Sequence, residues 1–269
     1  MKRLDRLKAR IRERYLAPYL GRRNWRPADM IPLQPEYLQS AFGFDEEAAV
    51  KQAAAIVSES TMASFERLAT LWQQVRYLDR NQIAGALVEC GVWKGGCAGL
   101  MALAHLHSHA TPFREIHLFD SFQGLPRPDN AVDGEEAIAM AEGNADGACI
   151  PIDCCTAEME DSRRLLIDTI GYPAELVKFH VGWFQQTLPE LSPSMEAIAL
   201  LRLDGDWYHS TMLCLQYLYP RVAQYGVVVT DDYGHFEGCR KAVDEFVAGL
   251  EKPVLLNHID YTARSWVKT

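Results

Sequence analysis

Short apolar segments that alternate with helix-length spacers restrict the fold of this chain more than any other feature of its sequence. Six such segments follow residue 82, at 86–90, 116–119, 177–181, 198–203, 226–230 and 253–259. Uninterrupted apolar strands are typical of a parallel sheet whose two faces are both covered by helices. We therefore predict an α/β fold, a doubly wound and mostly parallel sheet, over residues 81–269. A chain of 269 residues is long enough for one such domain with added termini.

Residues 1–80 are predicted to form an N-terminal helical arm and a cover segment. Residues 1–27 contain ten basic and two acidic side chains, a net +8, and because the whole chain carries −9 the remainder carries −17. Apolar residues at near-helical spacing predict a basic amphipathic helix in this arm. The arm either contacts an acidic partner, an anionic membrane surface or the protein's own acidic body, or it is a solvated helix that packs on the domain or on a second subunit of a homo-oligomer.

Bulk composition excludes several classes of protein. Hydrophobic residues make up 48% of the chain and charged residues 23%, which is typical of a globular domain and not of a disordered or fibrous chain. No apolar run is long enough for a bilayer span or a secretory signal, so we expect a cytoplasmic protein. The acidic main domain argues against a nucleic-acid groove.

The cysteines do not form a recognisable metal or redox motif. The chain has seven, and the pairs Cys90/Cys97, Cys149/Cys154 and Cys214/Cys239 all lack the two-residue gap of a zinc or redox hairpin. We expect reduced thiols. The adjacent Cys154 and Cys155 are either a redox pair or two small, semi-buried residues.

A glycine-rich turn, L-V-E-C-G-V-W-K-G-G, follows the first predicted strand and precedes a predicted helix. Glycines allow a tight turn and a close approach to a ligand, and the helix start offers free N–H groups. Gly91, Val92 and Gly95 are therefore candidate cofactor-binding residues, although a plain strand–helix turn has the same pattern. The spacing departs from G-x-G-x-x-G, which weakens a dinucleotide interpretation.

Two acidic residues flank this turn at the ends of the first two predicted strands. Asp120 stands where an acidic side chain grips the hydroxyls of a ribose, although it is also well placed to cap the turn that follows. Glu89 adds negative charge beneath the turn, which suits a cation better than a diphosphate. S-adenosylmethionine, which contains a ribose, an amine and a sulfonium, satisfies both observations.

Two further strands each end in a pair of aspartates: Asp204 with Asp206, and Asp231 with Asp232. One right-handed crossover fits between them, so both pairs are expected at the same carboxyl edge of the sheet. Four like charges at one edge favour a divalent cation, and all-oxygen ligation favours Mg²⁺, with Mn²⁺ or Ca²⁺ as substitutes. Asp206 is the best-placed general base, and helix capping is the alternative role for a single aspartate.

Several further residues are weaker candidates for the site, and each also has an ordinary structural interpretation. His209 lies close to Asp206 and is a candidate catalytic residue. Trp183 and Phe184 either stack on an adenine or belong to the core. The acidic stretch 129–147 is either a mobile lid or a solvated insertion. His105, His107 and His109 are interpreted as a solvated helix end.

Several motifs together, in this order along residues 55–247, resemble the TylF/MycF/NovP family of macrocin-type sugar O-methyltransferases. They are S-T-M-A-S-F-E-R-L, L-V-E-C-G-V-W-K-G-G, L-F-D-S-F-Q-G-L-P, V-G-W-F-Q-Q-T-L-P, L-R-L-D-G-D-W-Y-H-S-T and T-D-D-Y-G. The resemblance implies a metal-dependent class I methyltransferase that uses S-adenosylmethionine on a sugar hydroxyl. It implies Asp204, Asp231 and Asp232 as metal ligands and Asp206 as the base.

The same resemblance implies a set of residues that line the cofactor. These are Thr61, Met62, Glu89, Gly91, Asp120, Ser121 and Trp183, with Asp204 at the same edge serving both the cofactor and the metal. This chain has His209 where family members often carry an acid before the Ser-Thr pair. The expected partner is a sugar-containing small molecule whose identity, like the hydroxyl methylated, is left open.

Three other functions are consistent with parts of this sequence. A nicotinamide-dependent oxidoreductase has the same sheet but no use for four aspartates. A Mg²⁺-dependent phosphoester hydrolase accounts for the aspartates but leaves Glu89 and Asp120 without a role. A non-catalytic scaffold protein would retain the fold and use the basic arm to assemble on a partner.

Overall fold

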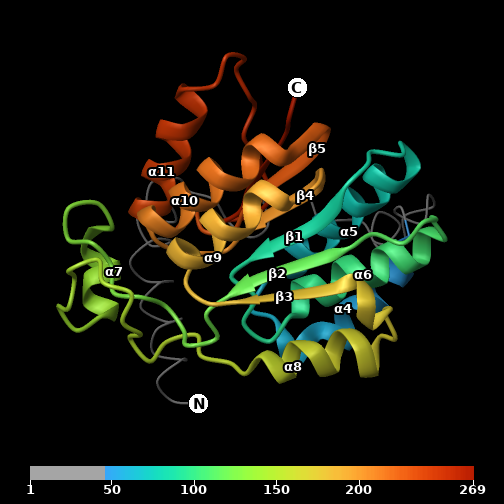
Figure 1. Cartoon of the computed structure of the whole chain (residues 1–269), viewed down its shortest axis with the longest axis horizontal. Helices are drawn as coiled ribbons and strands as arrows, with labels where there is room; N and C mark the ends of the chain where they lie inside the picture. Colours follow the sequence, from blue (N-terminus) through green and yellow to red (C-terminus); the bar gives the residue numbers. More distant parts are fainter. Residues whose placement is uncertain (1–45) are drawn as a thin grey trace, which may run out of the picture. The chain divides into compact units, whose positions relative to one another are not determined.

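The structure is a computed structural model that describes residues 46–269 (Figure 1). The predicted basic helix in residues 1–27 and the predicted cover segment, residues 26–44, lie outside the described residues. The described part contains one seven-stranded sheet with strand order β3-β2-β1-β4-β5-β7-β6. This α/β architecture confirms the predicted fold class.

Five parallel strands form most of the sheet. They are β1 (Ala86–Cys90), β2 (Ile116–Asp120), β3 (Val177–Val181), β4 (Ile198–Leu203) and β5 (Val222–Thr230). Strand β1 pairs with both β2 and β4, so the chain crosses from one half of the sheet to the other after β3. The carboxyl ends of β1, β2, β4 and β5, which carry the predicted site residues, therefore meet at one edge.

The far edge of the sheet differs from the prediction. The segment 253–259 contributes only the two-residue strand β6 (Asn257–His258), and the antiparallel strand β7 (Arg264–Val267) was not predicted. Strand β7 pairs with β5 through Val228↔Trp266 and Thr230↔Arg264. Its four residues include Arg264 and Ser265, so it has no apolar run that could reveal it in the sequence.

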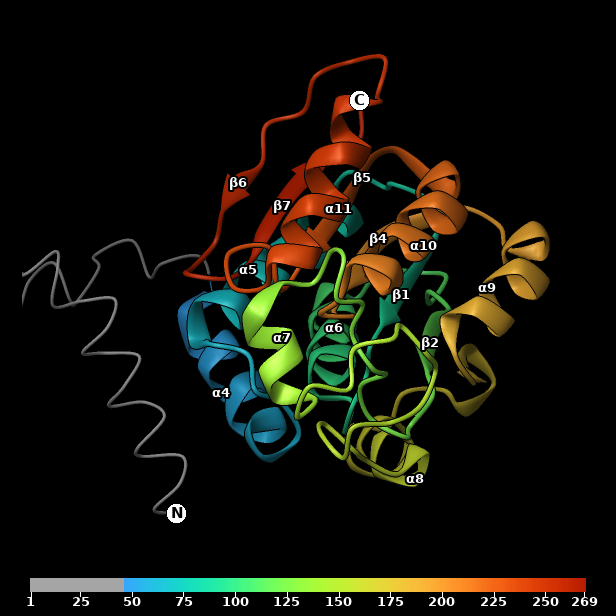
Figure 2. The same ribbon diagram turned by 90° about the vertical axis from the view of Figure 1, so that its left-hand side faces the viewer.

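Helices cover both faces of the sheet (Figures 1 and 2). The first face is covered by α4 (Glu47–Val57), α5 (Phe65–Arg80), α6 (Gly96–Ser108), and α8 (Met159–Arg163) with the helical turn Arg164–Thr169. The second is covered by α9 (Phe184–Leu191), α10 (Tyr208–Leu218) and α11 (Glu237–Ala248). The short helix α7 (Gly134–Met140) lies in the acidic stretch.

Alternate residues of each strand enter opposite cores. Leu87 and Leu200 pack with Trp72 of α5 and Met101 of α6, whereas Val88 belongs to the core on the other face. In the central strands β1 and β4, all positions except Ala86 are therefore buried on one side or the other, which explains why these strands are rich in apolar residues. Helices α4 and α5 share the first core with α6, and the predicted domain boundary at residue 80 stays a prediction.

Two histidines on neighbouring strands lie against each other near the β3 edge. The Nδ1 atom of His117 is 2.9 Å from Nε2 of His180, and the His180 ring stacks on Phe119 at 4.3 Å between centroids. Burial, together with the charges of His117 and Lys178, lowers the pKa of His180 to about 4, and burial also lowers the pKa of His117. Both rings are therefore neutral in the folded protein at neutral pH.

We predict that this pair makes the fold acid-sensitive. A histidine whose folded pKa is below its unfolded value of about 6.5 binds protons preferentially in the unfolded chain, so stability falls as pH drops from about 6.5 towards 4. Replacing His180→Asn should flatten the dependence of the unfolding free energy on pH in that window, measured by urea denaturation. The exposed His258→Asn is the matched control; identical slopes for His180→Asn and the wild type would show that the pair contributes nothing.

Candidate active site

The glycine-rich turn after β1 is tightly enclosed by other backbone segments. Gly91 has φ +86°, and a Cβ there would lie 1.8 Å from the backbone oxygen of Asp204. Gly95, at φ +81°, precedes α6, and a Cβ there would lie 2.9 Å from the side chain of Ser162. The two glycines thus allow the turn to pack against β4 and α8, which positions the start of α6 at the carboxyl edge of the sheet.

Asp120 ties this turn to the end of β2. Its Oδ2 accepts hydrogen bonds from the backbone N–H groups of Val92 at 2.6 Å and Trp93 at 3.0 Å, and its Oδ1 accepts one from Phe122 at 2.7 Å. A carboxylate offers about four acceptor positions. About one therefore remains for an external donor such as a ribose hydroxyl.

A buried arginine, Arg202 on β4, links the ends of three strands. Its Nη1 donates to Glu89 of β1 and to Asp204 after β4, both at 2.8 Å, and its Nη2 donates to Asp231 after β5 at 2.6 Å. Burial is the main cause that raises the pKa of Glu89, to about 8. The second carboxylate oxygen of Glu89, Oε2, is buried and has no hydrogen-bond partner among the described residues.

Three of the four predicted aspartates form a group. Carboxylate oxygens of Asp204, Asp206 and Asp232 lie within 4.8 Å of one another. Burial raises the pKa values of Asp206 and Asp232 well above their usual range, and the charge of Asp204 adds to the shift in both. Clustered carboxylates of this kind fit a divalent cation with oxygen ligands.

The backbone brings Asp206 into this group in an unexpected way. The sequence predicts that Asp204 and Asp206 lie on one side of an extended segment, but Asp206 has φ +56°, in the left-handed region. Its backbone N–H donates to Oδ2 of Asp232 at 3.3 Å. The chain therefore turns at Asp206 instead of continuing β4, and this turn leads directly into α10.

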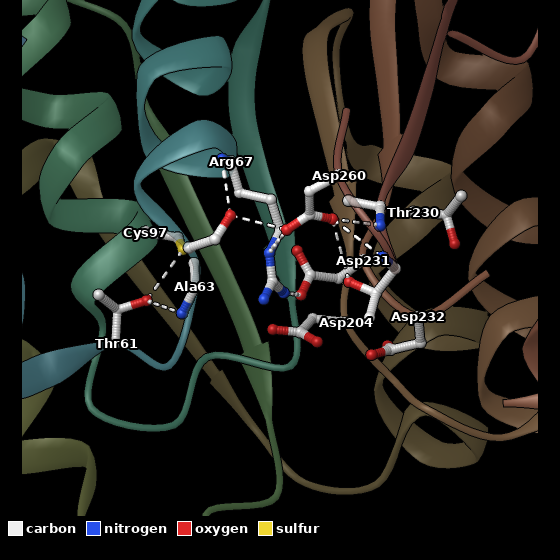
Figure 3. Close-up of polar contacts among 12 residues, drawn as sticks. Thr61, Ala63, Arg67, Cys97, Asp204, Thr230, Asp231, Asp232 and Asp260 are labelled. Carbon is white, nitrogen blue, oxygen red and sulfur yellow. Dashed lines mark hydrogen bonds and ion pairs between the residues drawn. The ribbon is translucent and has the colours of Figure 1, made fainter. Parts of the chain in front are cut away.

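The fourth aspartate, Asp231, faces a different set of partners (Figure 3). Its Oδ2 forms an ion pair with Arg67 of α5 and its Oδ1 accepts from Arg202. Asp231 and Asp232 are adjacent at the end of an extended strand, where successive side chains project to opposite sides. The structure thus brings Asp204 and Asp232 together, whereas the role of Asp231 as a metal ligand stays a prediction.

The acidic stretch is anchored beside this group. Asp133 is buried, and its Oδ1 accepts from the backbone N–H of Tyr208, the first residue of α10, at 2.6 Å. The segment closes on itself through the bridges Pro126↔Pro151 and Asp129↔Asp146. The sequence leaves open whether this stretch is a mobile lid or a solvated insertion. Neither interpretation included a buried anchor at the start of α10.

His209 points to the acidic stretch. Its Nε2 lies 2.9 Å from Oδ2 of Asp129, its side chain is 51% exposed, and this contact lowers the pKa of Asp129. Within residues 46–269, the structure shows no hydrogen bond or ion pair between His209 and Asp206. The proposed catalytic role of His209 thus has no geometric support and stays a prediction.

The other predicted site residues surround the turn at varied depths. The Oγ1 atom of Thr61 is 3.4 Å from Sγ of Cys97, Met62 is 64% exposed, and Ser121 is buried with its Oγ accepting from Gln123. Trp183 is half-buried at the start of α9. None of these side chains forms an ion pair within the described residues.

The prediction of a solvated histidine helix end is wrong for one member. His105 is buried, and its Nδ1 lies 2.8 Å from Asp79 while its Nε2 accepts from the backbone of Arg114. Both ring nitrogens are therefore used in a structural network. The adjacent Cys154 and Cys155 have Sγ atoms 3.7 Å apart and are half-buried.

Sequence reasoning missed the basic residues of the site. Arg202 interrupts an otherwise apolar strand, and a charge in such a position signals a buried partner. Arg67 and Asp260 carry no comparable signal, because their contact depends on how α5 packs against the β6–β7 turn. Asp133 is one of several acidic residues in the stretch 129–147, and nothing in the sequence distinguishes it from the others.

Comparisons with known proteins identify relatives of this chain. The family model for macrocin O-methyltransferase (TylF) matches residues 33–268. The chain is 34% identical over 210 residues to a demethyldecarbamoylnovobiocin O-methyltransferase of Streptomyces niveus, covering 78% of this chain and 76% of that protein. It is 34% identical over 189 residues to a mycinamicin III 3''-O-methyltransferase of Micromonospora griseorubida, covering 69% of each.

Solved structures agree with these sequence relatives. The O-methyltransferase NovP superposes with a TM-score of 0.67 at 34% identity, covering 78% of this chain and 82% of that one. TomG of Streptomyces achromogenes, solved in complex with SAM, has a TM-score of 0.52 at 16% identity, covering 87% of this chain and 95% of that one, and shows similarity of fold alone. Among the described residues, no helix has the length and apolar character needed to cross a bilayer.

We predict that Gly238→Ala displaces the anchor of the acidic stretch. Gly238 lies in the first turn of α11, and a Cβ there would fall 1.9 Å from Oδ1 of Asp133. Overpacking of this kind costs about 1–3 kcal/mol of stability, and hydrogen exchange should accelerate selectively in residues 126–151. Gly249→Ala, at the end of the same helix with 3.4 Å to its nearest neighbour, is the control. Unchanged exchange in Gly238→Ala would contradict the assigned anchor.

We also predict that Arg202→Met destabilises the fold strongly. The substitution leaves Glu89, Asp204 and Asp231 without their shared cation, and removing one partner of a buried ion pair costs about 3–5 kcal/mol. Urea unfolding measures the effect, and the exposed Arg221→Met should change stability by about 0.5 kcal/mol or less. Combining Arg202→Met with Glu89→Gln should restore part of the loss; no recovery would mean that Glu89 does not depend on Arg202.

Proposed function

The chain belongs to the macrocin O-methyltransferase (TylF) family, and we propose that it transfers the methyl group of S-adenosylmethionine to a hydroxyl of a sugar in a glycosylated natural product. The observation that carries this proposal is the group formed by Asp204, Asp206 and Asp232 beside the glycine-rich turn. The relatives' names describe O-methyltransferases of novobiocin and mycinamicin precursors. Membership of this family favours methyl transfer over the oxidoreductase and hydrolase alternatives.

The residues around the turn fit S-adenosylmethionine. Oε2 of Glu89 is a buried acceptor with no hydrogen-bond partner within residues 46–269, suited to an ammonium group, and Asp120 has an acceptor position left for a ribose hydroxyl. Backbone N–H groups at the start of α6 add a polar rim. We propose that these groups and the remaining predicted residues hold the cofactor: Thr61, Met62, Gly91, Val92, Gly95, Ser121, Trp183 and Asp204.

The aspartate group fits a divalent cation, with Mg²⁺ as the expected ion. Asp204 and Asp232 are its proposed ligands. Asp231, the third predicted ligand, has acceptor positions left beside its contacts with Arg67 and Arg202 and is proposed as a further ligand. A cation bound here would supply Lewis acidity that favours the ionised form of the acceptor hydroxyl.

Asp206 is the proposed general base. Its pKa is raised by burial and by the charges of Asp204 and Asp231, and a carboxylate of raised pKa is a better proton acceptor. Asp206 would accept the proton of the acceptor hydroxyl, and bound S-adenosylmethionine would supply the methyl group to the hydroxyl oxygen and leave as S-adenosylhomocysteine. No covalent enzyme intermediate is required. Alignment of the two bound reactants can contribute about 7–11 kcal/mol.

We predict that Asp206→Asn lowers turnover by about 10²–10⁴-fold, the usual contribution of a general base, while S-adenosylhomocysteine still binds. Turnover is measured as S-adenosylhomocysteine production with a panel of desmethyl deoxysugar glycosides, and binding by calorimetry. Asp153→Asn, an exposed aspartate, is the matched control.

Metal dependence is tested in the same assay. Turnover should stop with a chelator and return with Mg²⁺; equal rates with and without chelator would remove the metal from the proposal. Normal turnover by Asp206→Asn would remove its role as base. A wild-type chain that binds no S-adenosylhomocysteine would favour the scaffold alternative.

A further inference from the structure

Arg67 connects the proposed cofactor segment with the aspartates at the sheet edge (Figure 3). It lies in the first turn of α5, the helix that begins shortly after the predicted cofactor-lining residues Thr61 and Met62. Its guanidinium forms ion pairs with Asp231 and, at 2.9 Å from Nε, with Asp260. The side chain is only 19% exposed, so these contacts are largely shielded from water and salt.

The segment before α5 is fixed to the glycine-rich turn on its other side. The Oγ1 atom of Thr61 accepts from the backbone N–H of Ala63 at 3.1 Å and contacts Cys97 of α6. A Cβ at Gly96 would lie 2.5 Å from the backbone oxygen of Ser60, so this segment passes directly over the start of α6. Its position therefore determines the shape of the proposed cofactor pocket.

Asp260 completes a closed circuit of contacts. Its Oδ2 accepts from Ser64 Oγ at 2.7 Å, and its Oδ1 accepts from the backbone of Thr262 and Ala263, which fixes the β6–β7 turn. Strand β7 in turn pairs with β5, which ends at Asp231. Arg67 closes the circuit by touching both acids at once with different nitrogens of its planar fork, whereas a lysine ammonium would have to bridge both acids from a single nitrogen.

We infer that Arg67 is a positioning residue: by bridging Asp231 and Asp260 it holds the segment 61–64 over the glycine-rich turn and thereby sets the affinity for the cofactor. This inference rests on the proposed function. It also accounts for the orientation of Asp231, whose Oδ2 is held on Arg67.

Removal of Arg67 should leave a folded protein. Asp231 keeps its bond to Arg202, and Asp260 keeps Ser64 and two backbone donors, so neither acid loses all its partners. The effect on the cofactor can therefore be separated from an effect on stability.

The test measures S-adenosylhomocysteine binding to the full chain by calorimetry, with melting temperatures recorded in parallel. Arg67→Met should weaken binding by about tenfold, a typical coupling between contacting groups, and Arg67→Lys should fall between Arg67→Met and the wild type. Asp260→Asn should also weaken binding, and the double variant with Arg67→Met should be no worse than the poorer single variant. The control Arg164→Met, an arginine that is 63% exposed, should bind as the wild type does.

The outcomes separate the two proposals. If the wild type does not bind S-adenosylhomocysteine, the proposed function fails. If the wild type binds and folded Arg67→Met binds equally well, the inference about Arg67 fails and the proposed function stands. A merely structural role would lower the melting temperature without changing the affinity at temperatures well below the melting temperature.

Should Arg67→Met not fold, Ser64→Ala takes its place, because this substitution removes the hydrogen bond from the Ser64 hydroxyl to Asp260. Wild-type affinity in that variant would equally overturn the inference.

Discussion

The carboxyl edge of the sheet depends on one buried guanidinium. Arg202 is 3% exposed and is shared by carboxylates from the ends of β1, β4 and β5. Acids at this density could not share a buried edge without a cation between them. Arg202 therefore makes it possible for three parallel strands to end together in acidic residues, and every other feature of the site is arranged around that convergence.

The arginines also divide the aspartates into two sets. Asp231 pairs with Arg67 and Arg202, and Asp204 pairs with Arg202, whereas Asp206 and Asp232 form no ion pair with a basic side chain among the described residues. Asp206 and Asp232 therefore carry excess negative charge, and they lie beside the glycine-rich turn, where Glu89 and Asp120 have unused acceptor positions. A cationic cofactor and a divalent ion are the two ligands whose charge would relieve this excess, and both follow from the same imbalance.

Most of the fold could be predicted because the strands are buried on both faces. That burial is greatest in β1 and β4, and runs rich in apolar residues mark β1 to β4 within a residue of their observed bounds. Strand β7 could not be found, because its pairing with β5 comes from tertiary context and not from its own composition. The aspartates were located by the rule that parallel strands end at one edge. Their separate partners could not be, since the left-handed turn at Asp206 and the reach of Arg67 depend on packing between distant segments.

The contacts that build the site join parts of the chain that are far apart in sequence. Glu89 and Arg202 are separated by 113 residues, and Arg67 and Asp231 by 164. Bringing such distant segments together requires the loss of much chain entropy before any contact rewards it, so proteins of this topology fold slowly. The acidic edge forms only when these distant segments meet, and a partly folded chain in which they have not met exposes the carboxylates to water without their arginines.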